Sequence, residues 1–398
     1  MVTEKKSDLI RDLDFEVSSL CNAGCPVCMR RDKGHFTEFT QTYWRVEDVK
    51  QTIDVDLLKN LMGFNICGNF GDAMANPDIV KIIEWVREHN PTCSINLRTN
   101  GGVGSVEDYV AMAKHNVIVS FGIDGIGEKN ELYRVNVKWD KLYENLIAFT
   151  SNAEPHQTEI QFLLWSETAD QLTGIIDLAK EVKCDKLFLR KPYTHGELTE
   201  AHDMRGRSTH FLTELRHPIV DLLTKKHWRY SEFDYLKGEI ESSGVTASEL
   251  KISNFSITPK KIKVPKKYEF QEITYNDHEK EILNRSVKQT CFSKNRNDPS
   301  DLTNDLYNIY ITYDKMVMPC CMIPPEISNS INYMTGNESG FQKEILNKME
   351  SIGFEKFSLN NYTLREIVDS GVLHELVYND LVEDKPFGIC KMHCGRCL

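Results

Sequence analysis

Between the N-terminus and about residue 195, short runs of apolar and β-branched residues alternate with longer stretches in which apolar residues recur at helical spacing. The short runs predict strands, and the longer stretches predict amphipathic helices. The predicted strands are 13–18, 64–68, 94–99, 117–124, 159–164 and 186–190, and the predicted helices are 47–61, 77–89, 105–115, 139–150 and 168–182. Strands alternating with helices predict an α/β fold with a parallel sheet and right-handed crossovers. Such sheets bind ligands at the carboxyl ends of their strands.

Polar residues at two helix starts sharpen this prediction. Asn76 is a favourable N-cap and Pro77 suits the first helical position, so we expect the second helix to begin there. Ser105, followed three residues later by Asp108, has the pattern of a capping box at the start of the third helix.

The pattern becomes irregular after residue 195. The segment 196–285 is polar, with an aromatic group at 228–235 and five lysines between 260 and 267. A structureless loop of this length would be exceptional, so we expect some order. The segment is either a linker with an amphipathic helix and a solvated basic strand, or an insertion that covers the ligand-binding end of the sheet. Further on, a hairpin is predicted at 307–318 and a helix at 364–373. We therefore divide the chain into 1–195, 196–285 and 286–398.

The composition is that of an ordinary soluble globular protein, with 40% hydrophobic and 27% charged residues among 398. The formal net charge of −11 argues against broad binding to the phosphates of nucleic acids, although the lysines at 260–267 leave room for a local basic groove. No run approaches the roughly 20 apolar residues of a transmembrane helix. No apolar signal region follows the N-terminal lysines either. We therefore expect a cytoplasmic protein without a membrane partner.

The cysteines are unevenly placed along the chain. Of twelve, three are Cys21, Cys25 and Cys28, and six lie from Cys291 onward. In a cytoplasmic chain such groups indicate metal or redox sites rather than disulfides. The first group, spaced C-x3-C-x2-C after the first predicted strand, offers three thiolates to a [4Fe–4S] cluster, which needs four ligands and would keep one iron open. The alternatives are unrelated core thiols and a zinc site, although structural zinc sites have four closed ligands.

A second set of candidate residues lies at the ends of the next three predicted strands, and one further member follows ten residues after Asp124. Its members are Gly71, Asp72, Thr99, Asn100, Ser120, Asp124 and Arg134. Taken alone, each motif has a plainer interpretation, because Gly, Asn and Asp after a strand are turn signals and a lone arginine is usually a surface residue. Their common position at strand ends favours a shared ligand site.

Together, the cysteine group and these strand-end motifs resemble the radical S-adenosylmethionine superfamily over residues 10–195. The resemblance implies a partial (β/α)6 TIM-type barrel in which the three cysteines hold a [4Fe–4S] cluster and the open iron chelates S-adenosylmethionine. It implies that Asp72 accepts a hydrogen bond from the cofactor's amino group and that Arg134 pairs with its carboxylate. The sequence departs from the family at Asp72 and Phe70, which replace Glu and Gly, and at Val27, where an aromatic residue commonly stacks on adenine.

The C-terminal cysteines resemble the shortened "twitch" version of the SPASM auxiliary-cluster domain. This resemblance implies a C-terminal α+β domain with a second [4Fe–4S] cluster. Its ligands would be Cys291, Cys320, Cys394 and Cys397. Two further thiols, Cys321 and Cys390, leave the ligand set ambiguous, and a four-thiolate zinc site is the alternative.

The function that the resemblance implies is reductive cleavage of S-adenosylmethionine to a 5′-deoxyadenosyl radical. The radical would abstract a hydrogen atom from a peptide or small polar substrate, while the auxiliary cluster assists oxidation or binds substrate. A flavodoxin- or ferredoxin-type protein would donate the electron. Only about a dozen residues precede the first predicted strand, so we expect no N-terminal domain that binds a leader peptide. This slightly disfavours a leader-dependent peptide maturase. Three alternatives stay open: an aminocyclitol-type small-molecule dehydrogenase, nucleic-acid base modification, which the net charge disfavours, and a non-catalytic iron–sulfur or zinc scaffold.

Overall fold

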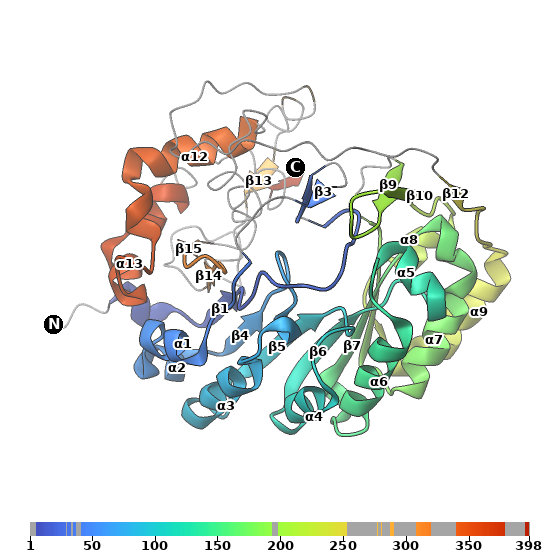
Figure 1. Ribbon diagram of the computed structural model, residues 1–398, viewed down its shortest axis with the longest axis horizontal. Helices are drawn as coiled ribbons and strands as arrows, with labels where there is room; N and C mark the ends of the chain where they lie inside the picture. Colours follow the sequence, from blue (N-terminus) through green and yellow to red (C-terminus); the bar gives the residue numbers. More distant parts are fainter. Residues whose placement is uncertain are drawn as a thin grey trace.

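One nine-stranded sheet organises the described part of the chain (Figure 1). The structure is a computed structural model that describes residues 5–28, 30–32, 35–36, 41–192, 198–252, 287–289, 308–319, 340–378 and 395–397, together with Asp277 and Lys280. Six parallel strands are neighbours in chain order: β1 (Asp12–Phe15), β4 (Gly63–Ile66), β5 (Ser94–Thr99), β6 (Val117–Gly122), β7 (Thr158–Leu163) and β8 (Lys186–Arg190). The predicted partial-barrel α/β fold is therefore confirmed.

Helices in the crossovers cover one face of this sheet. They are α1 (Val46–Thr52), α2 (Val55–Asn60), α3 (Ile79–His89), α4 (Val106–Lys114), α6 (Trp139–Thr150) and α7 (Leu172–Glu181), whereas the short α5 (Asn130–Tyr133) lies at the carboxyl end of β6, next to Arg134. The capping box at Ser105 is confirmed, since Ser105 N–H donates to the Asp108 carboxylate at 2.9 Å and the Ser105 hydroxyl accepts from Asp108 N–H at 3.2 Å. The predicted helix 47–61 is two helices, because Asp54 caps a new start by accepting from Leu57 N–H at 2.8 Å.

The second helix begins two residues later than predicted, although Asn76 bonds as an N-cap residue does. The helix begins at Ile79 with Asp78 as its N-cap, so Pro77 precedes it. The Asn76 side-chain oxygen accepts from Asp78 N–H at 2.8 Å, and its amide nitrogen donates to the carbonyls of Val17 and Trp44, both at 3.0 Å. Asn76 therefore ties the start of the crossover from β4 to β5 to the chain that leaves β1.

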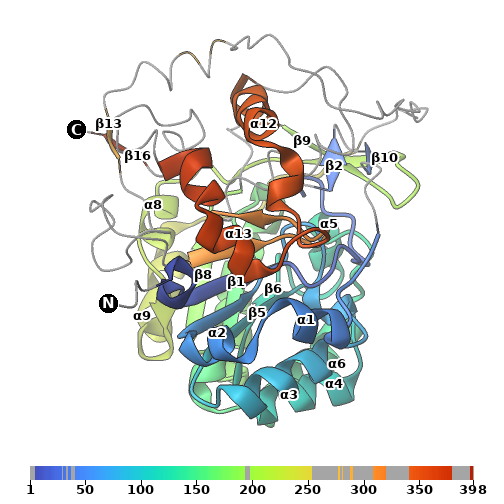
Figure 2. The ribbon, with the colours of Figure 1, turned by 90° about the vertical axis from the view of Figure 1, so that its left-hand side faces the viewer.

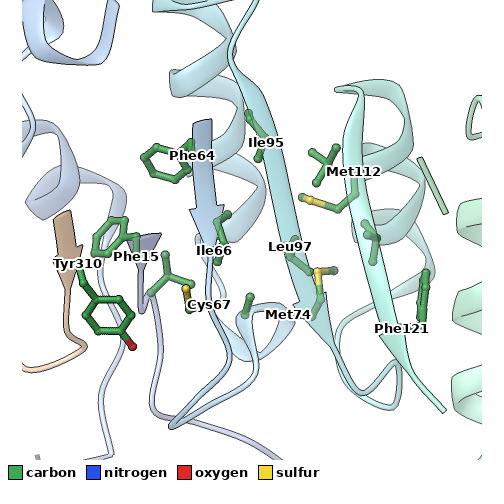
Figure 3. Close-up of a cluster of buried hydrophobic side chains, with 14 of the residues drawn as sticks. Phe15, Phe64, Ile66, Cys67, Met74, Ile95, Leu97, Met112, Phe121 and Tyr310 are labelled. Atoms are coloured by element: carbon green, nitrogen blue, oxygen red, sulfur yellow. The ribbon is translucent and has the colours of Figure 1, made fainter. Parts of the chain in front are cut away.

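The two faces of the sheet differ because side chains alternate along each strand. The residues that face the helices are apolar and buried, and Phe64, Ile66, Ile95 and Leu97 form one continuous layer with Met112 (Figure 3). Fully burying one such side chain stabilises the fold by about 1.5–3 kcal/mol. We call the opposite side the inner face. It carries mostly polar residues, and hydrogen bonds among them join neighbouring strands.

The predicted hairpin near residue 312 is confirmed, and it extends the main sheet. Its strands are β14 (Asn308–Ile311) and β15 (Val317–Met318), and β14 pairs in parallel with β1. Two helices, α12 (Gly340–Ile352) and α13 (Leu364–Ser370), lie beside this edge (Figure 2). Arg365 of α13 forms ion pairs with Asp54 and Asp8. The C-terminal part of the chain thus contacts the first helices, and the boundary at 286 stays a prediction.

The described part of the segment 196–285 is ordered. It contains β9 (Thr199–His202), β10 (Ser208–Leu212), α8 (Ile219–Leu223), β11 (Trp228–Arg229), α9 (Phe233–Ser243) and β12 (Lys251–Ile252). β11 extends the main sheet antiparallel to β8, and α9 is joined to α7 by the ion pair of Lys237 with Asp177 at 2.7 Å. The lysines at 260–267 lie outside the described residues. None of the described helices is both long and apolar enough to cross a membrane.

Candidate cofactor site

The first of the three cysteines, Cys21, is separated from the end of β1 by five residues. Hydrogen bonds to the ends of neighbouring strands hold the loop that carries all three. The Asn22 side chain donates to the Gly102 carbonyl at 3.0 Å, and Asn136 donates to the Asn22 carbonyl at 2.8 Å. Gly24 N–H donates to the Val135 carbonyl at 2.9 Å. The loop is therefore fastened to the segments that follow both β5 and β6, as a site assembled at carboxyl ends requires.

The three thiols are buried or half-buried, and they lie near the Asp72 carboxylate and the guanidinium groups of Arg30 and Arg134. Burial, followed by the nearby Asp72 carboxylate, raises the pKa of Cys21 to about 12. Burial likewise raises the pKa of Cys28, whereas Arg30 and Arg134 lower it. The uncharged form of the thiols is therefore favoured in the loop as it stands. If the thiols bound a metal as thiolates, the two guanidinium groups would balance the negative charge of the thiolates.

Three cysteine thiols are ligands of the kind that an iron–sulfur cluster takes. Among the described residues, no three Cys, His, Asp or Glu side chains converge to hold one metal ion. In a [4Fe–4S] cluster each thiolate binds a different iron, so the sulfurs need not meet at one point. Cys21, Cys25 and Cys28 nevertheless lie close enough for their charges to influence one another.

The second strand end approaches the first very closely. A Cβ at Gly71 would lie 2.1 Å from the Ser18 carbonyl oxygen, so only glycine fits. The buried Asp72 carboxylate accepts three hydrogen bonds: from Met74 N–H at 3.0 Å, the Thr99 hydroxyl at 2.9 Å and Asn100 N–H at 2.7 Å. A carboxylate has about four acceptor positions, so Asp72 keeps one for a further donor.

The third strand end connects Asp72 to the cysteine loop. The Asn100 side chain donates to Cys21 Sγ at 3.5 Å and to the Asn22 side chain at 2.9 Å. Its backbone N–H is the one held by Asp72. Gly101 follows with φ +74°, a conformation that glycine adopts without strain. Cys21, Asp72, Thr99 and Asn100 therefore form one bonded unit, as the sequence predicted they would meet.

The fourth strand end presents a buried ion pair. Arg134 Nε donates to the Asp124 carboxylate at 2.5 Å, and Asp124 also accepts from Leu163 N–H at 2.7 Å. Burial alone would lower the pKa of Arg134, but the Asp124 charge raises it above its ordinary value. A Cβ at Gly122 would lie 2.3 Å from Arg134 Nη2, so glycine leaves space for the guanidinium. The terminal nitrogens of Arg134 remain as donors for a carboxylate.

The remaining predicted site residues have different positions. Val27 is half-buried against the core, and Ser120 lies on the inner face within β6, two residues before that strand ends. Of the predicted auxiliary ligands, Cys291, Cys320 and Cys394 lie outside the described residues, as do Cys321 and Cys390. Cys397 lies in β16 (Gly395–Cys397), where it pairs with Val287 of β13 (Val287–Gln289).

Sequence reasoning missed Glu16, a fully buried acid on the inner face. Its Oε1 accepts from Asn69 N–H at 2.8 Å and from the Tyr310 hydroxyl at 2.7 Å, while Oε2 has no hydrogen-bond partner among the residues that the structure describes. The signal was the alternation of Asp12, Asp14 and Glu16 with apolar residues, which marks a strand with one polar face.

Comparisons with known proteins find likeness only among solved structures. No model of a known protein family and no curated protein matches the chain. Streptococcus suis SuiB bound to S-adenosylmethionine is similar with 12% identity, covering 98% of this chain and 73% of that one, at a TM-score of 0.47. In another SuiB structure the match spans 61% of that chain. Native anSMEcpe with bound AdoMet and Cp18Cys peptide is similar with 15% identity, covering 96% of this chain and 88% of that one, at a TM-score of 0.45. At such low identity, site residues are assigned from this chain's own geometry.

Proposed function

We propose that this chain is a radical S-adenosylmethionine enzyme that abstracts a hydrogen atom from a peptide or small polar substrate. The observation that carries the proposal is the bonded unit of Cys21, Asn100 and Asp72, which joins the cysteine loop to the ends of two further strands. A zinc or iron–sulfur scaffold would need the thiols alone. It would not need a partly satisfied carboxylate and a buried arginine beside them.

Each residue of the site has a role in this proposal. When bound, a [4Fe–4S] cluster supplies the electron for reductive cleavage of S-adenosylmethionine. Cys21, Cys25 and Cys28 hold that cluster, and Arg30 balances its charge. Asp72 and Arg134 orient the cofactor through the amino and carboxylate groups on the α-carbon of its methionine part. The members with supporting roles are Val27, Gly71, Thr99, Asn100, Ser120 and Asp124, which pack against the cofactor or position the residues that bind it.

The second cluster is proposed from the C-terminal thiols. Its ligands are Cys291, Cys320, Cys394 and Cys397, with Cys321 or Cys390 as the replacements to test. Support comes from the antiparallel pair β13–β16, because it holds Cys397 opposite Val287, four residues before Cys291 in the sequence. We propose that this cluster assists oxidation or binds the substrate, and that a flavodoxin- or ferredoxin-type protein in the cytoplasm supplies electrons.

Iron content and cofactor cleavage test the proposal together. Anaerobically reconstituted protein should bind about eight irons and, with dithionite, convert S-adenosylmethionine to 5′-deoxyadenosine. Replacing Cys21, Cys25 and Cys28 by Ala should leave about four irons and abolish cleavage. Cys93→Ala is the matched control, because Cys93 is a buried thiol at the opposite end of β5. Unchanged iron content in the triple variant would contradict the first cluster, and one zinc with four irons would contradict the second.

A further inference from the structure

A groove of about 450 Å³ lies between α5 and the turn that joins β9 to β10 (Figure 1). One wall is formed by residues between positions 131 and 138, at the end of α5 and in the segment that leads to α6. The other wall is formed by residues of the β9–β10 turn, between positions 203 and 207. None of the residues assigned to the cofactor lines this groove, so it is a separate feature of the surface.

The wall at 131–138 also holds the cysteine loop. Gly24 N–H donates to the Val135 carbonyl at 2.9 Å, and the Asn136 side chain donates to the Asn22 carbonyl at 2.8 Å. Val135 and Asn136 both line the groove, and their partners lie between the first two cysteines of the loop. The groove is therefore in direct contact, through single residues, with the backbone that would hold the first cluster.

The opposite wall is a tight turn with a fixed conformation. The Asp203 carboxylate accepts from the N–H groups of Arg205 and Arg207, both at 2.9 Å. The turn is joined to the first wall because the His210 ring donates to the Leu132 carbonyl at 2.9 Å. The two walls are thus held relative to each other, and the groove is formed without a bound partner.

The charges that point outward from the groove are positive. Lys138 pairs with Glu131 at 2.7 Å, and their side chains are 69% and 30% exposed. Arg207 pairs with Asp203 at 2.7 Å, with side chains 64% and 25% exposed. In each pair the acid is the less exposed member. Arg205 is exposed, and its guanidinium has no ion pair among the residues that the structure describes. A molecule that approaches the groove therefore meets three cations first.

We propose that this groove is the docking surface for a protein with an acidic surface that delivers electrons to the cluster of Cys21, Cys25 and Cys28. Opposite charges steer two proteins together and fix their orientation. The side chain of Met204, 40% exposed next to Arg205, adds an apolar contact. On docking, one electron passes from the reduced carrier to the cluster, and no bond forms or breaks between the two proteins. The identification of the partner as an electron carrier rests on the proposed function, whereas its binding requires no cleavage of the cofactor.

Two ways of supplying electrons test this surface in the reconstituted full chain. Dithionite is a small reductant that needs no docking surface, whereas a bacterial flavodoxin with NADPH and its reductase is an acidic carrier protein. Arg205→Glu, alone and combined with Lys138→Glu, should raise the KM for flavodoxin about 3- to 30-fold in cleavage of S-adenosylmethionine. The increase should shrink as salt is raised. Cleavage driven by dithionite should stay at the wild-type rate.

Lys114→Glu is the matched control. Lys114 is an exposed residue at the end of α4, just before β6 begins, and so lies at the opposite end of the sheet from the cysteine loop. Its reversal changes the net charge of the protein by the same amount as Arg205→Glu. Both flavodoxin-driven and dithionite-driven cleavage should equal those of wild type.

Binding of oxidised flavodoxin to the same proteins, measured without S-adenosylmethionine, separates the docking surface from the proposed function. Arg205→Glu should weaken this binding and Lys114→Glu should not. Equal effects of the two variants, or no binding of flavodoxin to wild type, would overturn the docking surface. An equal loss of dithionite-driven cleavage in Arg205→Glu would also overturn it, because the groove would then serve the cofactor or the substrate. Flavodoxin binding that depends on Arg205, in a protein that neither reductant causes to cleave S-adenosylmethionine, would contradict the proposed function and leave the surface standing.

Discussion

The two faces of the central sheet differ in what their residues contribute. The side towards the helices is formed by buried apolar residues such as Phe15, Phe64 and Phe121. The inner face carries the buried acid Glu16 and the exposed Arg98. Each of them is the next residue in the sequence after a buried apolar one, Phe15 and Leu97. Burying an acid or leaving arginines without partners adds nothing to stability. The difference indicates that one face maintains the fold and the other serves binding and chemistry.

Replacing neighbouring residues of β6 should show the largest contrast between the faces. Phe121 is fully buried, with its ring 5.8 Å from Tyr109 and 5.7 Å from Phe149. Phe121→Ala should destabilise the fold by about 3–5 kcal/mol. Ser120→Ala, one residue away on the inner face, should change stability by no more than about 0.5 kcal/mol. Chemical denaturation of both variants measures the contrast, and similar losses would refute the division between the faces.

Glu16 should make the stability of the inner face depend on pH. Burial, opposed by hydrogen bonds from Tyr310 and Asn69 and by the charge of Arg98, raises the pKa of Glu16 from 4.5 to about 7. The folded state therefore binds the proton more tightly than the unfolded state. This contribution is fully present below pH 4.5 and is lost as the pH rises through about 7.

The variant Glu16→Gln removes this titration. Relative to Glu16→Gln, the wild type should lose up to about 3 kcal/mol of stability between pH 4 and pH 8, since each pKa unit corresponds to about 1.4 kcal/mol. The facing groups Tyr310, Cys67 and Arg98 remain in both proteins. Denaturation midpoints at several pH values give the difference, and a constant difference would show that Glu16 titrates normally.

Asp72 should affect the cofactor more than the fold. Asp72→Ala removes the remaining acceptor for an amino group, so affinity for S-adenosylmethionine should fall about 10- to 100-fold. Iron content should stay unchanged, because the cysteines are intact. Asp78→Ala is the matched control, since Asp78 pairs with Lys81 at a helix start outside the site. Equal affinities of wild type and Asp72→Ala would remove Asp72 from the cofactor site.

A smaller effect should follow from Gly122→Ala. The added methyl group would meet Arg134 Nη2 at 2.3 Å and displace the guanidinium. An off-rotamer side chain costs about 0.5–1.5 kcal/mol, so cofactor affinity should fall about 2- to 10-fold. Gly238→Ala in α9 is the control, because no atom lies within 4 Å of the added methyl there. An unaffected Gly122→Ala protein would mean that Arg134 does not bind the cofactor's carboxylate.

Local features of the fold could be predicted from the sequence, and long-range contacts could not. The six strands and the Ser105 capping box depend on neighbouring residues, so periodicity and spacing were enough. The pairing of β14 with β1 is a long-range contact that no local pattern encodes. It places Tyr310 opposite Asp14, and the Tyr310 hydroxyl donates to Glu16, 294 positions away in the sequence. The long-range bonds of Asn76 were missed for the same reason, because its partners Val17 and Trp44 lie far back in the sequence.

The candidate site shows the same limit. Spacing predicted that the cysteine loop and the strand ends would meet, and the bonds of Asn100 to Cys21 and of Gly24 to Val135 show that they do. The inward turn of the Asp72 carboxylate towards Thr99 depends on side-chain geometry that a motif does not specify. The same holds for the position of Arg98 opposite Ser120, which depends on strand register.

Electron paramagnetic resonance of the reduced protein tests the central claim most directly. Cys394 and Cys397 are first replaced by Ala, so that only the cluster of Cys21, Cys25 and Cys28 contributes a signal. Adding S-adenosylmethionine should then shift the spectrum, because in the proposed site the cofactor binds the open iron next to Asp72 and Arg134. The shift should be absent or much weaker in the same protein carrying Asp72→Ala. A cluster spectrum that S-adenosylmethionine leaves unchanged in the parent protein would contradict the assignment of this strand end as a cofactor site.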